Sequence, residues 1–225
     1  MGQQRPLNKN ASIFTTARLL TDQSKLTSFT SMARPREFDR DGAVERAMSV
    51  FWRKGYAATS TDDLLRAMNI GRQSMYDTFG DKHRLYLEAL EKYQRDSVAE
   101  NIRRLRSTAS PLAGIEAFVI GIIASDKSVR ERGCMGVGSI CEFGNTDTDL
   151  VTLRARSGGA QHRALMERLR HAQAANEIGA NVDIEHAARF VETMMFGLQV
   201  SAKAGASLQS LRDTAAFAVA SLRKL

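Results

Sequence analysis

Apolar residues recur at helical spacing from the first well-patterned segment of the chain, residues 40–54. They fall at positions i, i+3, i+4 and i+7, which predicts an amphipathic helix with one buried face. The repeating positions are Val44, Ala47, Met48 and Phe51. Gly55 follows where a C-terminal helix cap is expected. Alternating apolar and polar runs, which are typical of strands, do not occur, and the pattern therefore predicts an all-α fold.

Residues 59–82 show the pattern of two short helices joined by a tight turn. Ser60 is a good N-cap, and Asp63 lies at the third helical position, where it would complete a capping box. Asn69-Ile70-Gly71 interrupts the first helix, and we expect the glycine to adopt the backbone angles of the turn. In the second helix the apolar residues Met75 and Phe79 lie four positions apart and should face inward.

The other side of this second helix carries hydrogen-bond donors, an acceptor and one aromatic ring. These residues are Arg72, Gln73, Ser74, Tyr76, Asp77 and Thr78. Arginine pairs with guanine, glutamine pairs with adenine, and aspartate accepts a hydrogen bond from cytosine. The surface therefore fits a helix that reads the major groove of DNA, with Asp77 as its least certain member because it could instead orient Arg72.

The rest of the chain also has helical periodicity, and capping residues divide it into segments. Helices are expected over about 81–107, from Pro111, over 149–175, from Asp183 and from Ser207. Residues 133–144 contain four glycines, which disfavour a helix by roughly 1 kcal/mol each relative to alanine, so we expect this segment to be distorted or mobile. The last helix carries an apolar stripe that is expected to form an oligomer interface with the helix before it: Leu208, Leu211, Ala215, Ala218 and Leu222.

The runs AVERAMSVFWRKGYAATSTDDLL, NIGRQSMYDTFGDK and LYLEAL, between about Phe38 and Leu90, resemble the DNA-binding domain of the TetR family of transcriptional regulators. The run GLQVSAKAGAS resembles the closing helices of the same family. The resemblance implies a three-helix helix-turn-helix domain at residues 33–83 and a helical ligand-binding and dimerisation domain at residues 84–225. It also implies that the helix over 81–107 transmits the regulatory signal.

The resemblance also assigns roles to individual residues. Tyr76 and Lys82 match family positions that contact phosphates. Arg72, Gln73, Ser74 and Asp77 match positions that face bases. Ser60 and Thr61, at the start of the first short helix, are included in the expected DNA-binding set.

The net charge of +7 and the isoelectric point near 9.7 are compatible with a nucleic-acid partner. In residues 33–82, however, acidic residues nearly match the basic ones, so charge alone is weak evidence for DNA binding. The sequence contains no run of about 18 consecutive apolar residues, which a membrane-spanning helix would require. Two cysteines do not form a disulfide framework, which favours a reducing, cytoplasmic location.

Residues 1–32 are rich in serine and threonine and lack apolar periodicity, so we interpret them as a disordered N-terminal extension. An organellar transit peptide has a similar composition and is the less favoured interpretation. Arg34-Pro35-Arg36 could contact the DNA backbone or the minor groove, or remain solvated.

No catalytic or metal-binding pattern is present in the sequence, so we expect a protein that is not an enzyme and needs no cofactor or metal. Ser139 lacks the glycines of a nucleophile elbow. His162 and His171 are nine residues apart, so they would point in opposite directions from one helix. We expect an adaptable apolar pocket that binds an effector, with six candidate residues: Phe118, Ile122, Cys141, Phe143, Met166 and Met194. Apolar residues of this kind fit an ordinary hydrophobic core equally well.

Cys134 has two interpretations. It is either a small buried apolar residue or a redox- or electrophile-sensing thiol, because Arg130 and Arg132 lie close to it in the sequence. Cys141 is seven residues away, about 10 Å along a helix, which is too far for a disulfide bond.

We therefore expect a regulator, most simply a repressor, that binds a palindromic operator as a homodimer and is released by a small molecule. One alternative is a regulator that senses oxidants or electrophiles through Cys134. Another, from a different class, is a helical small-molecule-binding protein without DNA-binding activity.

Overall fold

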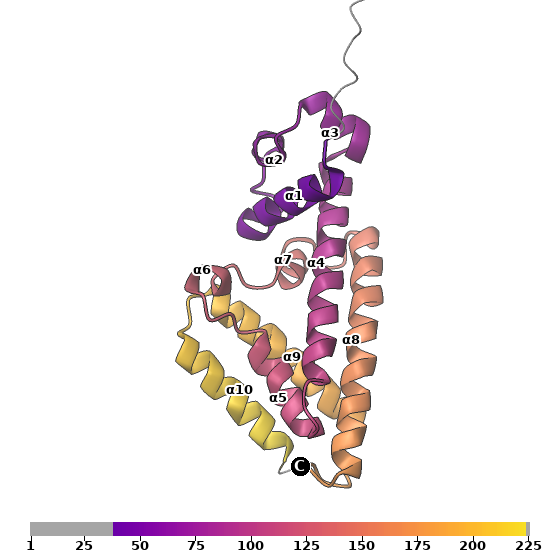
Figure 1. The fold of residues 1–225 in the computed structure, drawn as a ribbon, viewed down its shortest axis with the longest axis vertical. Coiled ribbons are helices and arrows are strands. Elements are labelled where there is room, and N and C mark those ends of the chain that lie inside the picture. The colour runs from indigo at the N-terminus through magenta and orange to yellow at the C-terminus, as the bar shows by residue number, and fades with distance from the viewer. Residues whose placement is uncertain (1–37, 224–225) are drawn as a thin grey trace, which may run out of the picture. The chain divides into compact units, whose positions relative to one another are not determined.

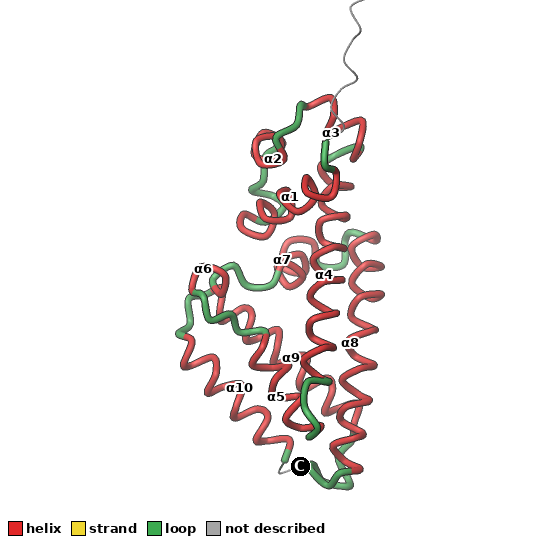
Figure 2. The backbone as a smooth tube through the Cα atoms, in the orientation of Figure 1, coloured by secondary structure: helices red, strands yellow, loops and turns green. Residues whose placement is uncertain are grey.

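The computed structural model describes residues 38–223, and in this range the chain forms helices and no strands. The helices are α1 (Arg40–Lys54), α2 (Thr61–Met68), α3 (Arg72–Phe79), α4 (Lys82–Leu105), α5 (Pro111–Gly121), α6 (Lys127–Arg130), α7 (Met135–Phe143), α8 (Thr148–Ala174), α9 (Ile184–Lys203) and α10 (Leu208–Leu222) (Figures 1 and 2). The expected all-α class is confirmed. The proposed extension at 1–32 and the arm Arg34-Pro35-Arg36 lie outside the described residues.

Helices α1, α2 and α3 correspond to the expected DNA-binding domain, and their ends follow the capping pattern of the sequence. Ser60 accepts a hydrogen bond from the Asp63 amide, and the Asp63 carboxylate accepts one from the Ser60 amide, so the predicted capping box is present. The prediction for the turn was wrong in one respect. Asn69 adopts the left-handed conformation with φ 55°, whereas Gly71 has φ −74° and caps α3. Asparagine tolerates this conformation because its short polar side chain can bond locally.

Helix α4 connects the DNA-binding domain to the C-terminal domain. Near its start, Leu85, Tyr86 and Leu90 are buried in one hydrophobic core with residues of α1, α2 and α3. At its end, Leu105 is buried in a second core with residues of α5, α8, α9 and α10. The boundary expected at residue 83 therefore falls within the first turn of a continuous helix.

Helix α7 was expected to be distorted or mobile, but the glycines do not interrupt it. The two glycines with positive φ, Gly133 at 66° and Gly144 at 54°, lie at its ends, where such a conformation stops a helix. Gly136 and Gly138 lie inside the helix. Met135 and Ser139 on one side of α7 are buried, so packing offsets the low helix propensity of glycine.

The apolar stripe of α10 faces the core of its own chain instead of a second copy. Leu211, Ala215 and Leu222 are buried in the core that α10 shares with α5 and α9, and Ala218 is also buried within its own chain. The stripe is therefore not available to a second copy, because the chain's own hydrophobic core takes it up. The large apolar side chains that stay exposed on α9 and α10 are Phe190, Phe196, Val200 and Phe217.

Candidate DNA-binding surface and effector cavity

The exposed side of α3 carries the residues expected to contact DNA. The side chains of Met75 and Phe79 are buried, with exposed fractions of 0% and 3%. The opposite side of the helix therefore faces solvent. The side chains on that exposed side are Arg72, Gln73, Ser74, Tyr76 and Asp77. Ser60 and Thr61 lie at the start of α2, the other helix of the helix-turn-helix pair. The structure thus brings seven of the eight proposed residues to the two helices of this motif.

Acidic side chains orient the polar residues of α3. Arg72 Nη2 donates to Asp62 Oδ1 at 2.6 Å, and Gln73 Nε2 donates to Asp77 Oδ1 at 2.7 Å. The partner of Asp77 is therefore Gln73 rather than Arg72. Because this bond uses one of the two amide protons of Gln73, its carbonyl oxygen and its second proton remain available to a base edge.

Lys82, the eighth residue, is the first residue of α4 and is turned toward the protein. Its ammonium group lies 4.2 Å from the centre of the Tyr56 ring. Burial lowers the pKa of Lys82, while the nearby Glu142 carboxylate opposes this shift. The ammonium group is half-buried in this arrangement and would have to move away from Tyr56 to reach a phosphate.

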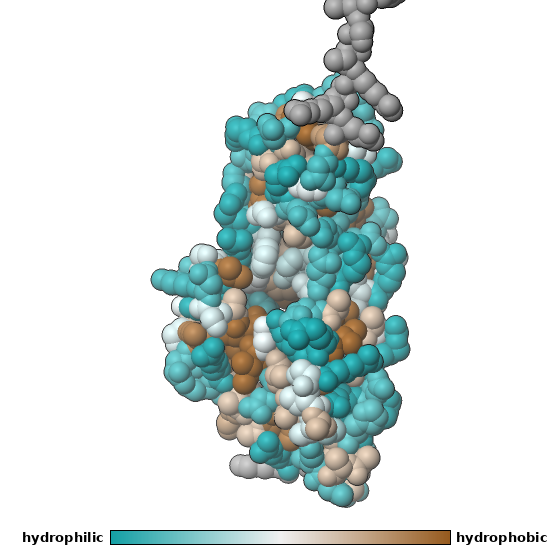
Figure 3. All heavy atoms as spheres, in the orientation of Figure 1, coloured by the Kyte–Doolittle hydropathy of each residue, from teal (hydrophilic) through white to brown (hydrophobic). Residues whose placement is uncertain are grey.

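A cavity of about 850 Å³ lies between the DNA-binding domain and the C-terminal helices. Residues of α1, α4, α5, α6, α7, α8 and α9 form its wall, and the surface is hollowed between α6 and the DNA-binding domain (Figure 3). Its volume is in the range of pockets that hold small organic ligands. We call it the effector cavity.

Only one of the six proposed pocket residues, Ile122, lines the effector cavity. Phe118 is fully buried in the C-terminal core, and Met166 and Met194 pack against that core. Phe143 stacks among the aromatic rings of Tyr56 and Tyr86. Cys141 is exposed on α7. The apolar pattern identified core positions because a sequence does not distinguish a residue that fills the core from one that borders a cavity.

Cys134 lies on the wall of the effector cavity and is the N-cap residue of α7. It is half-buried, and burial together with the neighbouring Cys134 thiol raises the pKa of Tyr93. Cys134 thus combines access to the cavity with a position at the N-terminus of a helix.

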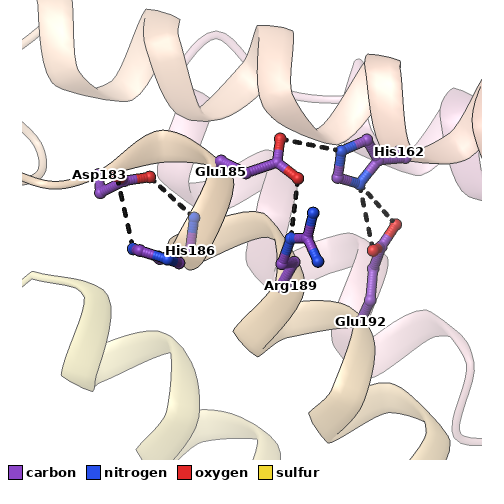
Figure 4. Close-up of polar contacts among 6 residues, drawn as sticks. All are labelled: His162, Asp183, Glu185, His186, Arg189 and Glu192. Atoms are coloured by element: carbon purple, nitrogen blue, oxygen red, sulfur yellow. Dashed lines mark hydrogen bonds and ion pairs between the residues drawn. The ribbon is translucent and has the colours of Figure 1, made fainter.

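The ionisable side chains named here on the cavity wall are Asp96, Glu100, Arg104, Arg130, Arg154, His162 and Glu192. His162 of α8 contacts two carboxylates of α9 (Figure 4). Its Nδ1 lies 3.2 Å from Glu192 and its Nε2 lies 3.3 Å from Glu185. Glu185 also pairs with Arg189, so a small polar network links the two helices beside the cavity.

Helix α7 contacts the effector cavity on one side and the DNA-binding domain on the other. Cys134, Gly136, Val137 and Ile140 line the cavity. The Glu142 carboxylate accepts hydrogen bonds from two backbone amides of the loop after α1, Tyr56 at 3.0 Å and Ala57 at 2.9 Å. Just beyond α7, Asp147 contacts His83 of α4 at 2.6 Å.

Sequence reasoning missed two residues of this region, Trp52 and Glu142. Trp52 lies outside the buried stripe of α1, lines the cavity, and donates from Nε1 to the Gly133 carbonyl at 2.9 Å. Being the single tryptophan of the chain was its only signal. Glu142 is the one charged residue within an apolar, glycine-rich helix, and that exception was a usable signal.

Among residues 38–223, no three His, Cys, Asp or Glu side chains are grouped so that they could hold a metal ion. In the same part of the chain, no helix is both long enough and apolar enough to cross a membrane.

The fold and the exposed α3 surface define a helix-turn-helix DNA-binding protein, and comparisons with known proteins agree. The model for bacterial regulatory proteins of the tetR family matches residues 43–89. The HTH-type transcriptional repressor ComR of Escherichia coli (strain K12) is 32% identical over 190 residues, which cover 82% of this chain and 89% of ComR. The HTH-type transcriptional regulator YezE of Bacillus subtilis (strain 168) is also 32% identical, over 81% of this chain and 95% of YezE.

A solved structure of a cysteine-substituted form of the TetR family transcriptional regulator CifR, complexed with 26-bp double-strand operator DNA, has a similar fold. The TM-score is 0.71 and the identity is 31%, over 84% of this chain and 99% of that chain. The chain belongs to the TetR family of transcriptional regulators. It is a non-enzymatic DNA-binding protein, as expected from the sequence.

The contact between Glu142 and the loop after α1 yields a first prediction. Glu142→Ala removes the acceptor of the Tyr56 and Ala57 amides, so both amides should exchange their hydrogens faster than in the parent protein. The free energy of unfolding should fall by about 1–2 kcal/mol, the usual scale of exposed bonds to a charged group. Hydrogen exchange followed by NMR measures the first effect, and urea denaturation measures the second. Glu131→Ala, which removes an exposed glutamate paired only with Lys127 at 3.7 Å, is the control. Unchanged protection of both amides would contradict the prediction.

Proposed function

We propose that this protein is a ligand-released repressor that binds a palindromic operator as a homodimer. The observation that carries the proposal is the position of α7, which lines the effector cavity and also binds the loop of the DNA-binding domain through Glu142. A ligand that shifts α7 also shifts the domain that reads DNA. A coupling free energy of about 1–3 kcal/mol would lower operator affinity roughly 5–150-fold. Because it acts on DNA, we place the protein in the cytoplasm.

The names of the relatives support the repressor assignment and the DNA partner. ComR is a transcriptional repressor, and the CifR structure contains operator DNA. In a two-fold symmetric dimer, the two copies of α3 would enter successive major grooves about 34 Å apart. A palindromic operator with half-sites one helical turn apart fits this geometry.

We assign the dimer interface to the exposed sides of α9 and α10. Phe190, Phe196, Val200 and Phe217 are between 44% and 77% exposed there. Soluble monomers rarely expose several large apolar side chains on adjacent helices, whereas interface cores are enriched in aromatic residues.

A second candidate function is thiol sensing through Cys134. The observation that favours it is the position of this thiol at the N-terminus of α7, on the wall of the effector cavity. Modification of the sulfur by an oxidant or an electrophile would place new atoms between the cavity and α7. The same helix would then transmit a covalent signal to the DNA-binding domain.

Two substitutions distinguish base contacts by α3 from phosphate contacts by Lys82. Once an operator has been isolated from genomic fragments, Arg72→Ala should lower operator affinity by about 1–3 kcal/mol and leave binding to unrelated DNA nearly unchanged. Lys82→Ala should weaken binding to both and reduce the slope of log K against log salt by about one. Fluorescence anisotropy at several salt concentrations measures both quantities. An equal effect of Arg72→Ala on operator and unrelated DNA would exclude this residue as a base reader.

The interface assignment predicts the effect of a buried charge. Phe217→Glu should yield monomers with an intact helical fold, because a glutamate without a partner in a buried interface costs several kcal/mol. Ala216→Glu adds the same charge to the neighbouring exposed position of α10, on a different side of the helix, and should remain dimeric. Sedimentation velocity measures the oligomeric state and circular dichroism checks the fold. A dimer of Phe217→Glu would place the interface elsewhere.

Thiol sensing and non-covalent sensing make different predictions for the two cysteines. If Cys134 is the sensor, N-ethylmaleimide or hydrogen peroxide should release the parent protein and Cys141→Ser from the operator, but should not release Cys134→Ser. If the effector binds without a covalent bond, these reagents should affect Cys134→Ser and the parent protein alike. Gel-shift assays before and after treatment measure the release.

A further inference from the structure

Two arginines on the wall of the effector cavity have carbonyl groups, and no carboxylate, as partners among the described residues. They are Arg130 of α6 and Arg154 of α8. Each has one buried nitrogen without a hydrogen-bond partner in this part of the chain, Nε of Arg130 and Nη1 of Arg154. A buried cation without a counter-charge is costly, because the protein replaces its hydration only in part. An anion in the cavity would reduce this cost.

The carboxylates of the cavity wall already have partners within the chain. Glu100 pairs with Arg104 at 3.0 Å, and Glu192 contacts His162 at 3.2 Å. Asp96 pairs with a lysine of the preceding turn at 3.1 Å. A cationic ligand would have to displace one of these partners, whereas an anionic ligand meets two arginines that lack a carboxylate. The wall therefore favours an anion.

The guanidinium group of Arg130 has a complete two-donor edge outside its bonds to the chain. Its Nη1 donates to the Ala124 carbonyl at 3.0 Å and to the Ser125 carbonyl at 2.9 Å. Both bonds use Nη1, so the edge formed by Nε and Nη2 takes no part in them. The two parallel N–H groups of such an edge match the two oxygens of a carboxylate. The carbonyl bonds also hold the group in place, so an anion would find it pre-ordered.

Arg154 is less suited to hold a carboxylate with two bonds. Its Nη2 donates to the carbonyl of Gly144, the residue that ends α7. Both two-donor edges of a guanidinium group include Nη2, so neither edge of Arg154 is complete. We therefore assign the anionic group of the ligand to Arg130.

The Arg130 end of the cavity is separated from Glu192. Gln199 of α9 lies at this end, because its Nε2 donates at 3.1 Å to the carbonyl of Ile122, two residues before Ala124. Glu192 lies seven residues earlier on the same helix, about 10 Å along the helix axis. An anion at Arg130 would therefore not meet the Glu192 carboxylate directly.

The turn that carries Arg130 also contacts α1 of the DNA-binding domain. The Gly133 amide donates to the Arg130 carbonyl at 3.0 Å, and the Gly133 carbonyl accepts from Trp52 Nε1 at 2.9 Å. One peptide turn thus connects the backbone of Arg130 to a side chain of α1.

We propose that the effector is an organic anion with an apolar body, whose carboxylate binds the Nε and Nη2 edge of Arg130. The inference rests on the proposed function of a ligand-released regulator and names the ligand class and its anchoring residue. The apolar body lies against the neighbouring wall residues Ile122, Val129 and Trp52. Movement of Arg130 toward the anion shifts the turn that holds Trp52, favours arrangements in which α1 is displaced, and lowers operator affinity.

A matched acid and amide test the ligand class. 1-Naphthaleneacetate carries a carboxylate at neutral pH, and 1-naphthaleneacetamide has the same framework with an uncharged group of similar size. In calorimetric titrations of the full chain without DNA, the acid should bind at least tenfold more tightly than the amide. Equal or tighter binding of the amide, or absence of binding by the acid, would overturn the proposal.

Three glutamine variants locate the anionic group. Arg130→Gln should bring the ratio of acid to amide affinity toward one and leave amide affinity nearly unchanged. Lys127→Gln removes a charge from an exposed position of the same helix, outside the cavity wall, and should retain the ratio of the parent protein. Arg154→Gln should reduce the ratio less than Arg130→Gln does. A larger loss in Arg154→Gln than in Arg130→Gln, or an equal loss in Lys127→Gln, would overturn the assignment to Arg130.

A measurement on the parent protein covers the case in which Arg130→Gln does not fold. In NMR spectra of the ¹⁵N-labelled chain, the Nε–H signal of Arg130 should shift and its hydrogen should exchange more slowly when the acid is added. The amide at the same concentration should cause neither change. An Arg130 signal that does not respond to the bound acid would exclude this residue as the anchor.

The coupling to DNA is tested by competition and by Trp52→Phe. The acid should lower operator affinity, and operator DNA should lower acid affinity by the same factor. Trp52→Phe keeps an aromatic ring but cannot donate to Gly133, so it should bind the acid while this factor falls toward one. An unchanged factor would overturn the role of the turn.

Two outcomes distinguish this proposal from the proposed function. Release of the operator by the amide as readily as by the acid would overturn the anionic ligand class and leave ligand release intact. Tighter binding of the acid with no loss of operator affinity would contradict ligand release at this cavity, and with it the effector role of the anion.

Discussion

The Glu142 carboxylate joins α7 to the loop after α1 by hydrogen bonds, beside the packing of Met135 and Phe143 against the core of α1, α2 and α3. It accepts hydrogen bonds from two successive backbone amides at the start of the loop after α1, where no helix supplies an acceptor. Both bonds are exposed to solvent, and a carboxylate is the stronger kind of acceptor for such amides. In the same region, the Lys82 ammonium group lies over the Tyr56 ring and the Phe143 ring lies beside it.

The DNA-binding surface illustrates why local charge pairing matters more than net charge. The chain carries a formal charge of +7, yet Arg72 is bound to Asp62 and Gln73 to Asp77 in the described arrangement. These acids hold their partners in defined positions and also oppose the DNA backbone electrostatically. Such a surface favours selective contact with base edges over strong unspecific attraction to phosphates.

Much of the fold was predictable from the sequence because it depends on local signals. The capping box of Ser60 and Asp63, the buried pair Met75 and Phe79, and the N-cap Asp81 follow from neighbouring residues. The effector cavity was not predictable, because its wall combines residues from seven helices whose distances are set by packing. Periodicity correctly marked Phe118 as apolar and inward, but only the assembled core shows that it is enclosed by other side chains. In the same way, the stripe around Ala218 could face either its own chain or a second one until α5 and α9 were in place.

Gly55 shows how the Glu142 contact restricts the variation of the chain. Its φ of 81° disfavours any residue with a side chain, and a Cβ at this position would lie 2.4 Å from Glu142 Oε1. A larger residue at position 55 therefore displaces the carboxylate at position 142 from its present position, although the two positions are 87 residues apart in the sequence. The constraint acts in one direction, because Glu142 can change while Gly55 stays, and the effects of substitutions at both positions should not add.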